Sequence, residues 1–203
     1  MKGRVQQSGA GDYTLCERCN NDTGAWYGNA FADWTWQGAR ILSLAEGQPS
    51  LYYNFQIFPL CVIKQVLCMF FSTNGEKFRG AQPELVRLIL NREERCLKPG
   101  IRIFTFFNSS PVTRQTGVVG QANVFTGKVT IMSEIAFPPL GYLMTFNSEP
   151  PKEQLVDISF FAGYRYSDWK EISLRIPALP VYTYLPGDYR PREAFRKFPS
   201  GEE

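Results

Sequence analysis

The amino-acid sequence predicts an α+β fold in which helices come first and a mostly antiparallel β-sheet follows. In the first half of the chain, apolar residues recur at helical spacing, and from Pro99 onward the apolar period changes to two. Aromatic residues make up 15% of the sequence, which favours sheet because these side chains suit a pleated, half-buried surface. Helices followed by strands are typical of an α+β protein and not of βαβ repetition.

The chain length suits one compact domain, because 203 residues with 44% hydrophobic content can bury a sizeable core. We expect a helical region that carries a Cys-x-x-Cys knuckle over residues 1–98. An antiparallel β region is expected over 99–186. Residues 187–203 read as a surface tail, because they are rich in proline and arginine.

Three helices are expected in the first region. Proline suits the first position of a helix, because its fixed φ angle is compatible and its missing N–H has no partner to lose there. Two of the helices therefore begin at a proline, and Asn74-Gly75 is a turn signal that ends the second. Gly38 stands where a C-cap of the first helix is expected. The expected helices span residues 25–37, 59–71 and 83–91.

The first expected helix carries an aromatic face, because Tyr27, Phe31 and Trp34 recur at i, i+4 and i+7. We interpret this face as core that packs against the sheet. The alternative is that the aromatic cluster, which lies near Arg18 and Arg40 in the sequence, stacks bases of a nucleic acid. The cluster comprises Trp26, Tyr27, Phe31, Trp34 and Trp36.

The second region predicts a series of short strands separated by turn residues. Apolar residues alternate from Ile101 to Phe107, and glycine or proline separates the later runs. A further extended segment is expected over 47–58, before the second helix. The predicted strands of the second region span residues 101–107, 117–125, 128–137, 140–147, 155–161, 170–176 and 179–185.

Composition excludes several classes of function. The chain has no histidine, so a Ser-His-Asp triad, a Cys-His dyad and a His-ligated metal site cannot form within it. A net charge of +3 permits a polyanionic partner without arguing for one. No apolar run is long enough to span a membrane. An odd number of cysteines without an apolar leader favours a reducing, cytoplasmic location.

Cys16 and Cys19 form a Cys-x-x-Cys motif, the one motif in the sequence that indicates a specific chemistry. Two cysteines two residues apart orient both sulfurs toward one metal ion, so we predict them as zinc ligands. The site is incomplete within this chain, because zinc takes four ligands and Cys61 and Cys68 share a hydrophobic helix face that marks them as core. Cys96 reads as a loop cysteine. The alternatives are a redox pair, which needs a preceding strand, and two ordinary cysteines at a helix start.

The segment Leu15–Gly24 resembles the second half of the zinc-bound treble clef of HNH-type endonucleases, in which an LCxxCN element begins a helix. The resemblance implies zinc on Cys16 and Cys19 and nucleic-acid substrates, with Asn20 carried over by position. The family's earlier CxxC pair and its catalytic histidine are absent, so this form is expected to be inactive. We expect either a degenerate knuckle or an N-terminal part that the chain as given lacks. In the second case the upstream codons encode another CxxC and a histidine.

Two functions follow from these observations. The first is a nucleic-acid-binding or nuclease-related module with a partial zinc knuckle, in which Arg18, Asn20 and Arg40 contact nucleic acid. The second is a non-catalytic protein–protein interaction or structural protein. Two other features each have two interpretations. The segment 160–169 reads as a sheet edge or as an exposed aromatic and basic face. The second feature is a set of carboxylates in or near the expected strands, which we interpret as solvated or salt-bridged: Glu134, Asp157, Asp168 and Glu171.

Overall fold

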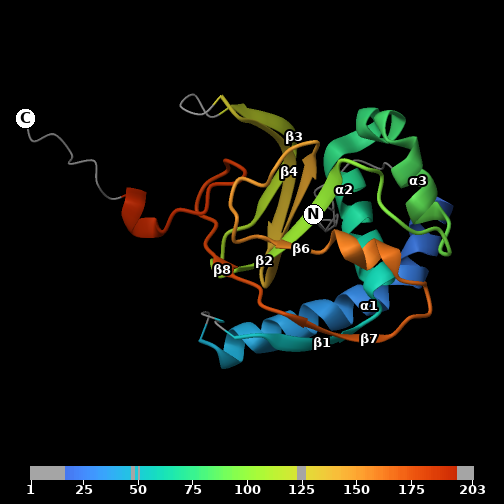
Figure 1. Cartoon of the computed structure of the whole chain (residues 1–203), viewed down its shortest axis with the longest axis horizontal. Helices are drawn as coiled ribbons and strands as arrows, with labels where there is room; N and C mark the ends of the chain where they lie inside the picture. Colours follow the sequence, from blue (N-terminus) through green and yellow to red (C-terminus); the bar gives the residue numbers. More distant parts are fainter. Residues whose placement is uncertain (1–16, 47–48, 50, 123–126, 196–203) are drawn as a thin grey trace, which may run out of the picture.

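The computed structural model describes residues 17–46, 49, 51–122 and 127–195. In this part of the chain, three α-helices and an antiparallel sheet region form the structure, and the N-terminal helix precedes the strands (Figure 1). The α+β class predicted from the sequence is therefore confirmed. No helix among these residues is long and apolar enough to cross a membrane.

The three helices are α1 (Glu17–Leu44), α2 (Pro59–Ala81) and α3 (Pro83–Leu90). The two predicted proline starts are confirmed. The expected span of the first helix is too short at both ends, and at its C-terminal end the reason is that Gly38 is not a cap. It is buried in mid-helix where a Cβ atom would lie 3.3 Å from the Phe107 ring. This glycine lets the helix approach the sheet closely.

The second helix is interrupted where the turn signal was expected, but the chain then resumes a helical course. Gly75 has a φ of 74° and a ψ of −169°, which lie outside the helical region. The preceding Asn74 ties this break to the sheet, because its side-chain amide donates to the Ser133 hydroxyl over 3.0 Å. Its Oδ1 accepts the backbone N–H of Val118. The kink is therefore a docking point between α2 and the sheet.

The strands form two sheets. A six-stranded sheet has the path β3-β4-β5-β2-β6, and β8 pairs in parallel with β2. The other pairs in this sheet are antiparallel. A separate antiparallel pair joins β1 to β7. The strands are β1 (Tyr53–Ile57), β2 (Ile101–Asn108), β3 (Arg114–Ala122), β4 (Val129–Phe137), β5 (Leu140–Phe146), β6 (Val156–Asp157), β7 (Lys170–Leu174) and β8 (Ala178–Leu179).

Two predicted strands are much shorter than expected. The 155–161 segment contains only β6 and then turns into a 3₁₀ helix at Ser159–Gly163, which buries Phe161 in the core beside α2. The 179–185 segment contains only the end of β8. Both segments are rich in apolar and aromatic residues, and their remaining parts are held by side-chain contacts instead of a strand ladder.

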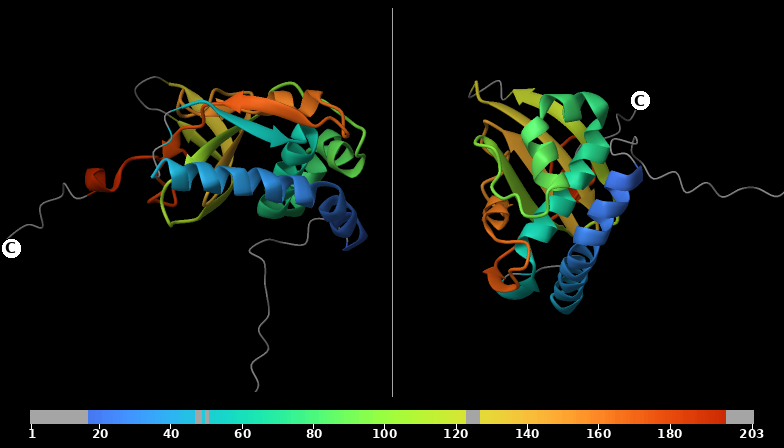
Figure 2. Two further views of the ribbon diagram at one scale, coloured as in Figure 1. Left: turned by 90° about the horizontal axis from the view of Figure 1, so that it is seen from below. Right: turned by 90° about the vertical axis from the view of Figure 1, so that its right-hand side faces the viewer.

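The central strands β2 and β5 of the six-stranded sheet are buried on both faces, whereas most of the edge strand β3 is not. The helices cover one face, where the main core contains Ile103 and Phe107 of β2 (Figure 2). The alternate residues Phe104 and Phe106 point into a smaller core on the other face. Residues of the C-terminal segment close this smaller core, and Tyr189 among them is only 6% exposed. The beginning of the expected surface tail is therefore packed against the sheet.

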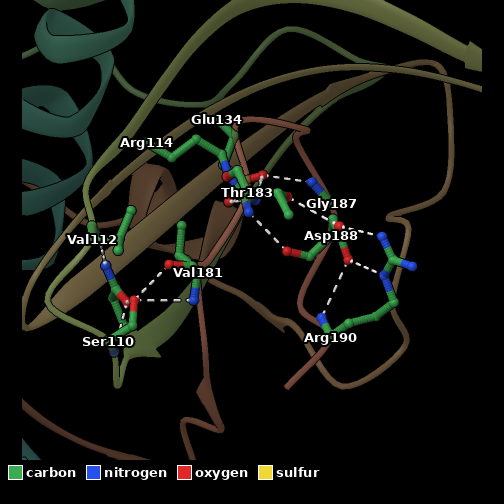
Figure 3. A network of polar contacts seen from close by, with 10 residues as sticks. Ser110, Val112, Arg114, Glu134, Val181, Thr183, Gly187, Asp188 and Arg190 are labelled. Atoms are coloured by element: carbon green, nitrogen blue, oxygen red, sulfur yellow. Dashed lines mark hydrogen bonds and ion pairs between the residues drawn. The ribbon is translucent and has the colours of Figure 1, made fainter. Parts of the chain in front are cut away.

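A buried ion pair fastens this C-terminal segment. Arg114 and Glu134 are fully buried, and the Arg114 Nη1 lies 2.9 and 3.0 Å from the two carboxylate oxygens (Figure 3). The other Arg114 nitrogens donate to the carbonyls of Thr183 and Asp188 over 2.9 and 2.8 Å. The Gly187 N–H donates to Glu134 over 2.7 Å. The salt-bridge interpretation of Glu134 is therefore confirmed.

Asp188 continues this network toward the surface. Its carboxylate accepts the Thr183 hydroxyl over 3.0 Å and two hydrogen bonds of 2.9 Å from the Arg190 guanidinium. These contacts, above all those from Arg190, lower the pKa of Asp188 to about 2. The carboxylate therefore stays ionised throughout the neutral range and holds the turn around Gly187.

Candidate binding groove

A surface groove lies where α1 runs beside the β1–β7 pair. Strand β1 runs between α1 and β7 (Figure 2). Its Phe55 is fully buried, and the Phe55 and Trp34 ring centroids are 4.5 Å apart. The α1 face with Tyr27 and Trp34 is core, as the sequence predicts, and the Trp34 indole N–H donates to the Tyr142 hydroxyl over 2.9 Å. The helix and the strand are thus fixed to one another through their buried sides.

Gln37 joins α1 to the outer edge of β1. Its side-chain amide donates to the Gln56 carbonyl and accepts the Gln56 N–H, each over 2.8 Å. A side-chain amide thus pairs with the strand as the backbone of a neighbouring strand would. Because backbone groups alternate between the two edges of a strand, the N–H and C=O of Asn54 point to the same edge as those of Gln56. The Asn54 N–H and C=O therefore point away from β7, on the edge that Gln37 covers at Gln56.

Side chains from α1, β1 and the residue before β7 line a surface groove of about 740 Å³ along this edge. The α1 residues follow helical spacing, so they form one face of the helix. The groove is lined by Asp33, Trp36, Gln37, Arg40, Ile41 and Leu44 of α1, by Tyr53, Asn54 and Gln56 of β1, and by Trp169.

Two tryptophans of this groove are exposed to solvent. Trp36 is 75% exposed and Trp169 is 52% exposed, although tryptophan is highly buried on average. Leu44, which also lines the groove, is 74% exposed. Leaving these surfaces in water is unfavourable at roughly 25 cal/mol per Å² of apolar area. Three large apolar side chains that line one groove are therefore mostly open to solvent.

The groove carries one charge of each sign. Asp33 and Arg40 are both exposed, and neither makes an ion pair with another residue in the described ranges. Nearby Glu171 is engaged by the Asn54 side-chain amide over 3.0 Å. The groove therefore presents an aromatic floor with an available carboxylate and an available guanidinium, and it has no excess of positive charge.

The residues predicted to bind nucleic acid do not form one site. Arg18 is 90% exposed at the start of α1 and pairs with Asp22 over 3.8 Å. Asn20 is exposed, and its carbonyl accepts the Thr23 hydroxyl. Arg40 lies about 33 Å further along the helix, because each residue advances the axis by about 1.5 Å. Only Arg40 belongs to the groove.

The predicted zinc ligands are described only in part. Cys19 is half-buried in the first turn of α1, and Cys16 lies outside the described residues. The described ranges contain no group of three or more His, Cys, Asp or Glu side chains that could hold a metal ion. A four-ligand zinc site is therefore not assembled from these residues.

A second cluster of ionisable groups lies in the core. Cys61 and Cys68 are 4% and 6% exposed, which confirms their interpretation as core residues. Burial raises the pKa of the Cys61 thiol to about 11 and that of the Cys68 thiol to about 12. Both are protonated at neutral pH, so neither is an activated nucleophile.

Lys64 is the unexpected member of this cluster. It is fully buried, and its ammonium donates to the carbonyls of Asn91 and Arg92, over 2.8 and 2.9 Å, just past the end of α3. It also lies 5.6 Å from the centre of the Tyr27 ring. Burial lowers the pKa of Lys64 to about 8. These contacts give Lys64 a structural role as a cap for the carbonyls that follow α3.

Sequence reasoning missed two important groove residues. It grouped Trp36 with the buried aromatic residues, but positions 34 and 36 point about 200° apart on a helix, so only Trp34 is core. It left Trp169 at the end of the 160–169 segment, whose interpretation as an exposed aromatic and basic face was the available signal. Phe160 in the same segment is 47% exposed.

No family model, curated protein or solved structure matches this chain.

Proposed function

We propose that this chain is a non-catalytic binding module that captures a segment of another protein in the groove between α1 and β1. The observation that carries the proposal is the pair of exposed tryptophans, Trp36 and Trp169, which line one groove on two separate elements. Tryptophan, tyrosine and arginine dominate the energetics of protein interfaces, and the groove contains all three with Tyr53 and Arg40.

The surroundings of the groove support this proposal. Its α1 wall is fixed by the Gln37–Gln56 hydrogen bonds and by the buried Trp34, so the binding surface is formed before a ligand arrives. The exposed backbone groups of Asn54 offer one donor and one acceptor to an incoming main chain. A cytoplasmic location belongs to the same proposal, and the thiols of Cys61 and Cys68 accord with it.

Display of random peptides on phage tests the proposal. The wild-type chain is the bait, and the Trp36→Ala/Trp169→Ala double variant is used for counter-selection. Tyr184→Ala removes an aromatic side chain that is 87% exposed outside the groove and serves as the matched control. We expect peptides that bind wild type and the control but not the double variant. Absence of enrichment, or enrichment that survives the double substitution, would contradict the proposed function.

A nucleic-acid-binding module with a partial zinc knuckle is the second candidate. The observation that favours it is that Arg18 and Asn20 are exposed at the start of α1, beside Cys19. The metal content of purified protein tests the knuckle, because about one zinc per chain supports it. Binding of single-stranded DNA that weakens steeply with salt would support the candidate, and no binding at low salt would contradict it.

A further inference from the structure

We infer that the groove selects an extended peptide in which an acidic and a basic residue stand four positions apart, with an apolar residue midway between them. This inference rests on the proposed function and specifies the chemistry of the partner. It starts from Asp33 and Arg40, the two charges of the groove, and from Trp36, which lies between them on the same helix face.

The spacing of the two charges matches an extended peptide. Asp33 and Arg40 are two helical turns apart, which corresponds to about 10 Å along the axis of α1. Side chains of an extended chain alternate between two faces, and the chain advances about 3.3 Å per residue, so residues four positions apart share a face about 13 Å apart. The long side chain of Arg40 covers the difference of about 3 Å. A peptide that runs along α1 therefore places one charge against Arg40, the opposite charge against Asp33 and an intervening side chain against Trp36.

The availability of these charges distinguishes a peptide from a nucleic acid. Neither Asp33 nor Arg40 is neutralised by another described residue. A phosphate backbone repeats one sign of charge, so a strand that meets Arg40 also meets the Asp33 carboxylate, which repels it. A peptide carries both signs, and its main chain offers an acceptor and a donor to the outward-pointing N–H and C=O of Asn54.

Charge exchange between protein and peptide tests the inference. Two synthetic peptides carry the core Glu-Ser-Leu-Ser-Lys or Lys-Ser-Leu-Ser-Glu between glycine and serine flanks, so that the two charges and the leucine share one face of the extended chain. Because the strand edge fixes one direction of the peptide, wild type is expected to bind one of the two about tenfold more tightly than the other. The variant Asp33→Lys/Arg40→Glu is expected to prefer the other peptide by a similar factor.

The matched control exchanges the other exposed charge pair of the same helix, in Arg18→Glu/Asp22→Lys. This control is expected to keep the wild-type preference, and circular dichroism melting checks that all variants fold. Equal affinity of wild type for the two peptides, or a preference that the groove exchange leaves unchanged, would overturn the inference.

The remaining outcomes separate the inference from the proposed function. Peptides selected on phage through Trp36 that lack the charge pair overturn the inference and leave the function intact. Failure of all peptides, selected or synthetic, overturns both. Binding of an oligothymidylate that Trp36→Ala abolishes overturns the inference in favour of the nucleic-acid candidate.

Discussion

The buried Arg114–Glu134 pair should behave as one unit in the stability of this fold. Arg114→Met leaves the Glu134 carboxylate buried without its cationic partner, and it leaves the carbonyls of Thr183 and Asp188 without the Arg114 donors. Breaking a buried ion pair on one side costs about 3–5 kcal/mol, and each abandoned carbonyl adds about 1 kcal/mol or more. We therefore expect Arg114→Met to lower the free energy of unfolding by about 5 kcal/mol.

Removing both partners should cost no more than removing the arginine alone. The double variant Arg114→Met/Glu134→Met contains no uncompensated charge, and its remaining cost comes from backbone groups that lose one hydrogen bond each. Urea denaturation of wild type, both single variants and the double variant measures the coupling free energy. The reasoning is refuted if the two single losses add in the double variant, or if Arg114→Met costs less than about 1 kcal/mol.

Three further predictions concern a helix contact, a titration and the groove. Gly38→Val should lower the free energy of unfolding by about 1–3 kcal/mol in urea, because its side chain enters the contact between α1 and the sheet. Burial lowers the pKa of Lys64 from its ordinary value of 10.5 to about 8 in the folded state, which disfavours the charged form. This penalty of about 3 kcal/mol is full below pH 8 and is lost as the pH rises toward 10.5. Urea denaturation at pH 7 and pH 10 should therefore show wild type gaining stability relative to Lys64→Met, and equal changes would contradict this. Trp36→Ala should change the free energy of unfolding by less than about 0.5 kcal/mol, because the side chain is exposed, and a loss above 2 kcal/mol would assign it to the core.

The sequence predicts those features of the fold that depend on local chemistry. Pro59 and Pro83 mark helix starts because a proline at the first helical position is a local preference. Gly38 wrongly predicts a helix end, because the glycine serves a close contact between the helix and Phe107 of a distant strand. The overlong 179–185 strand has a similar cause, because the network around Arg114 holds that segment in place of a ladder.

The groove could be predicted only in part for the same physical reason. Helical periodicity separates Trp34 from Trp36 once the buried face of the helix is known. The sequence also indicates Arg40 as a binding residue, although for nucleic acid. Trp169 reaches the groove only because β7 pairs with β1 across more than half of the chain, and no local pattern encodes that pairing. Lys64 is signalled by its place in an otherwise apolar helix run, but its acceptors lie on a separate element.

The tryptophan indole N–H signals in a nitrogen–proton correlation spectrum test the central claim most directly. The chain has four tryptophans, of which Trp36 and Trp169 line the groove and Trp34 is buried against Tyr142 as an internal reference. On titration with the preferred charge-paired peptide, the account predicts that the signals of Trp36 and Trp169 shift together while that of Trp34 stays in place. Saturable binding of the peptide with no change at Trp36 and Trp169 would contradict the account.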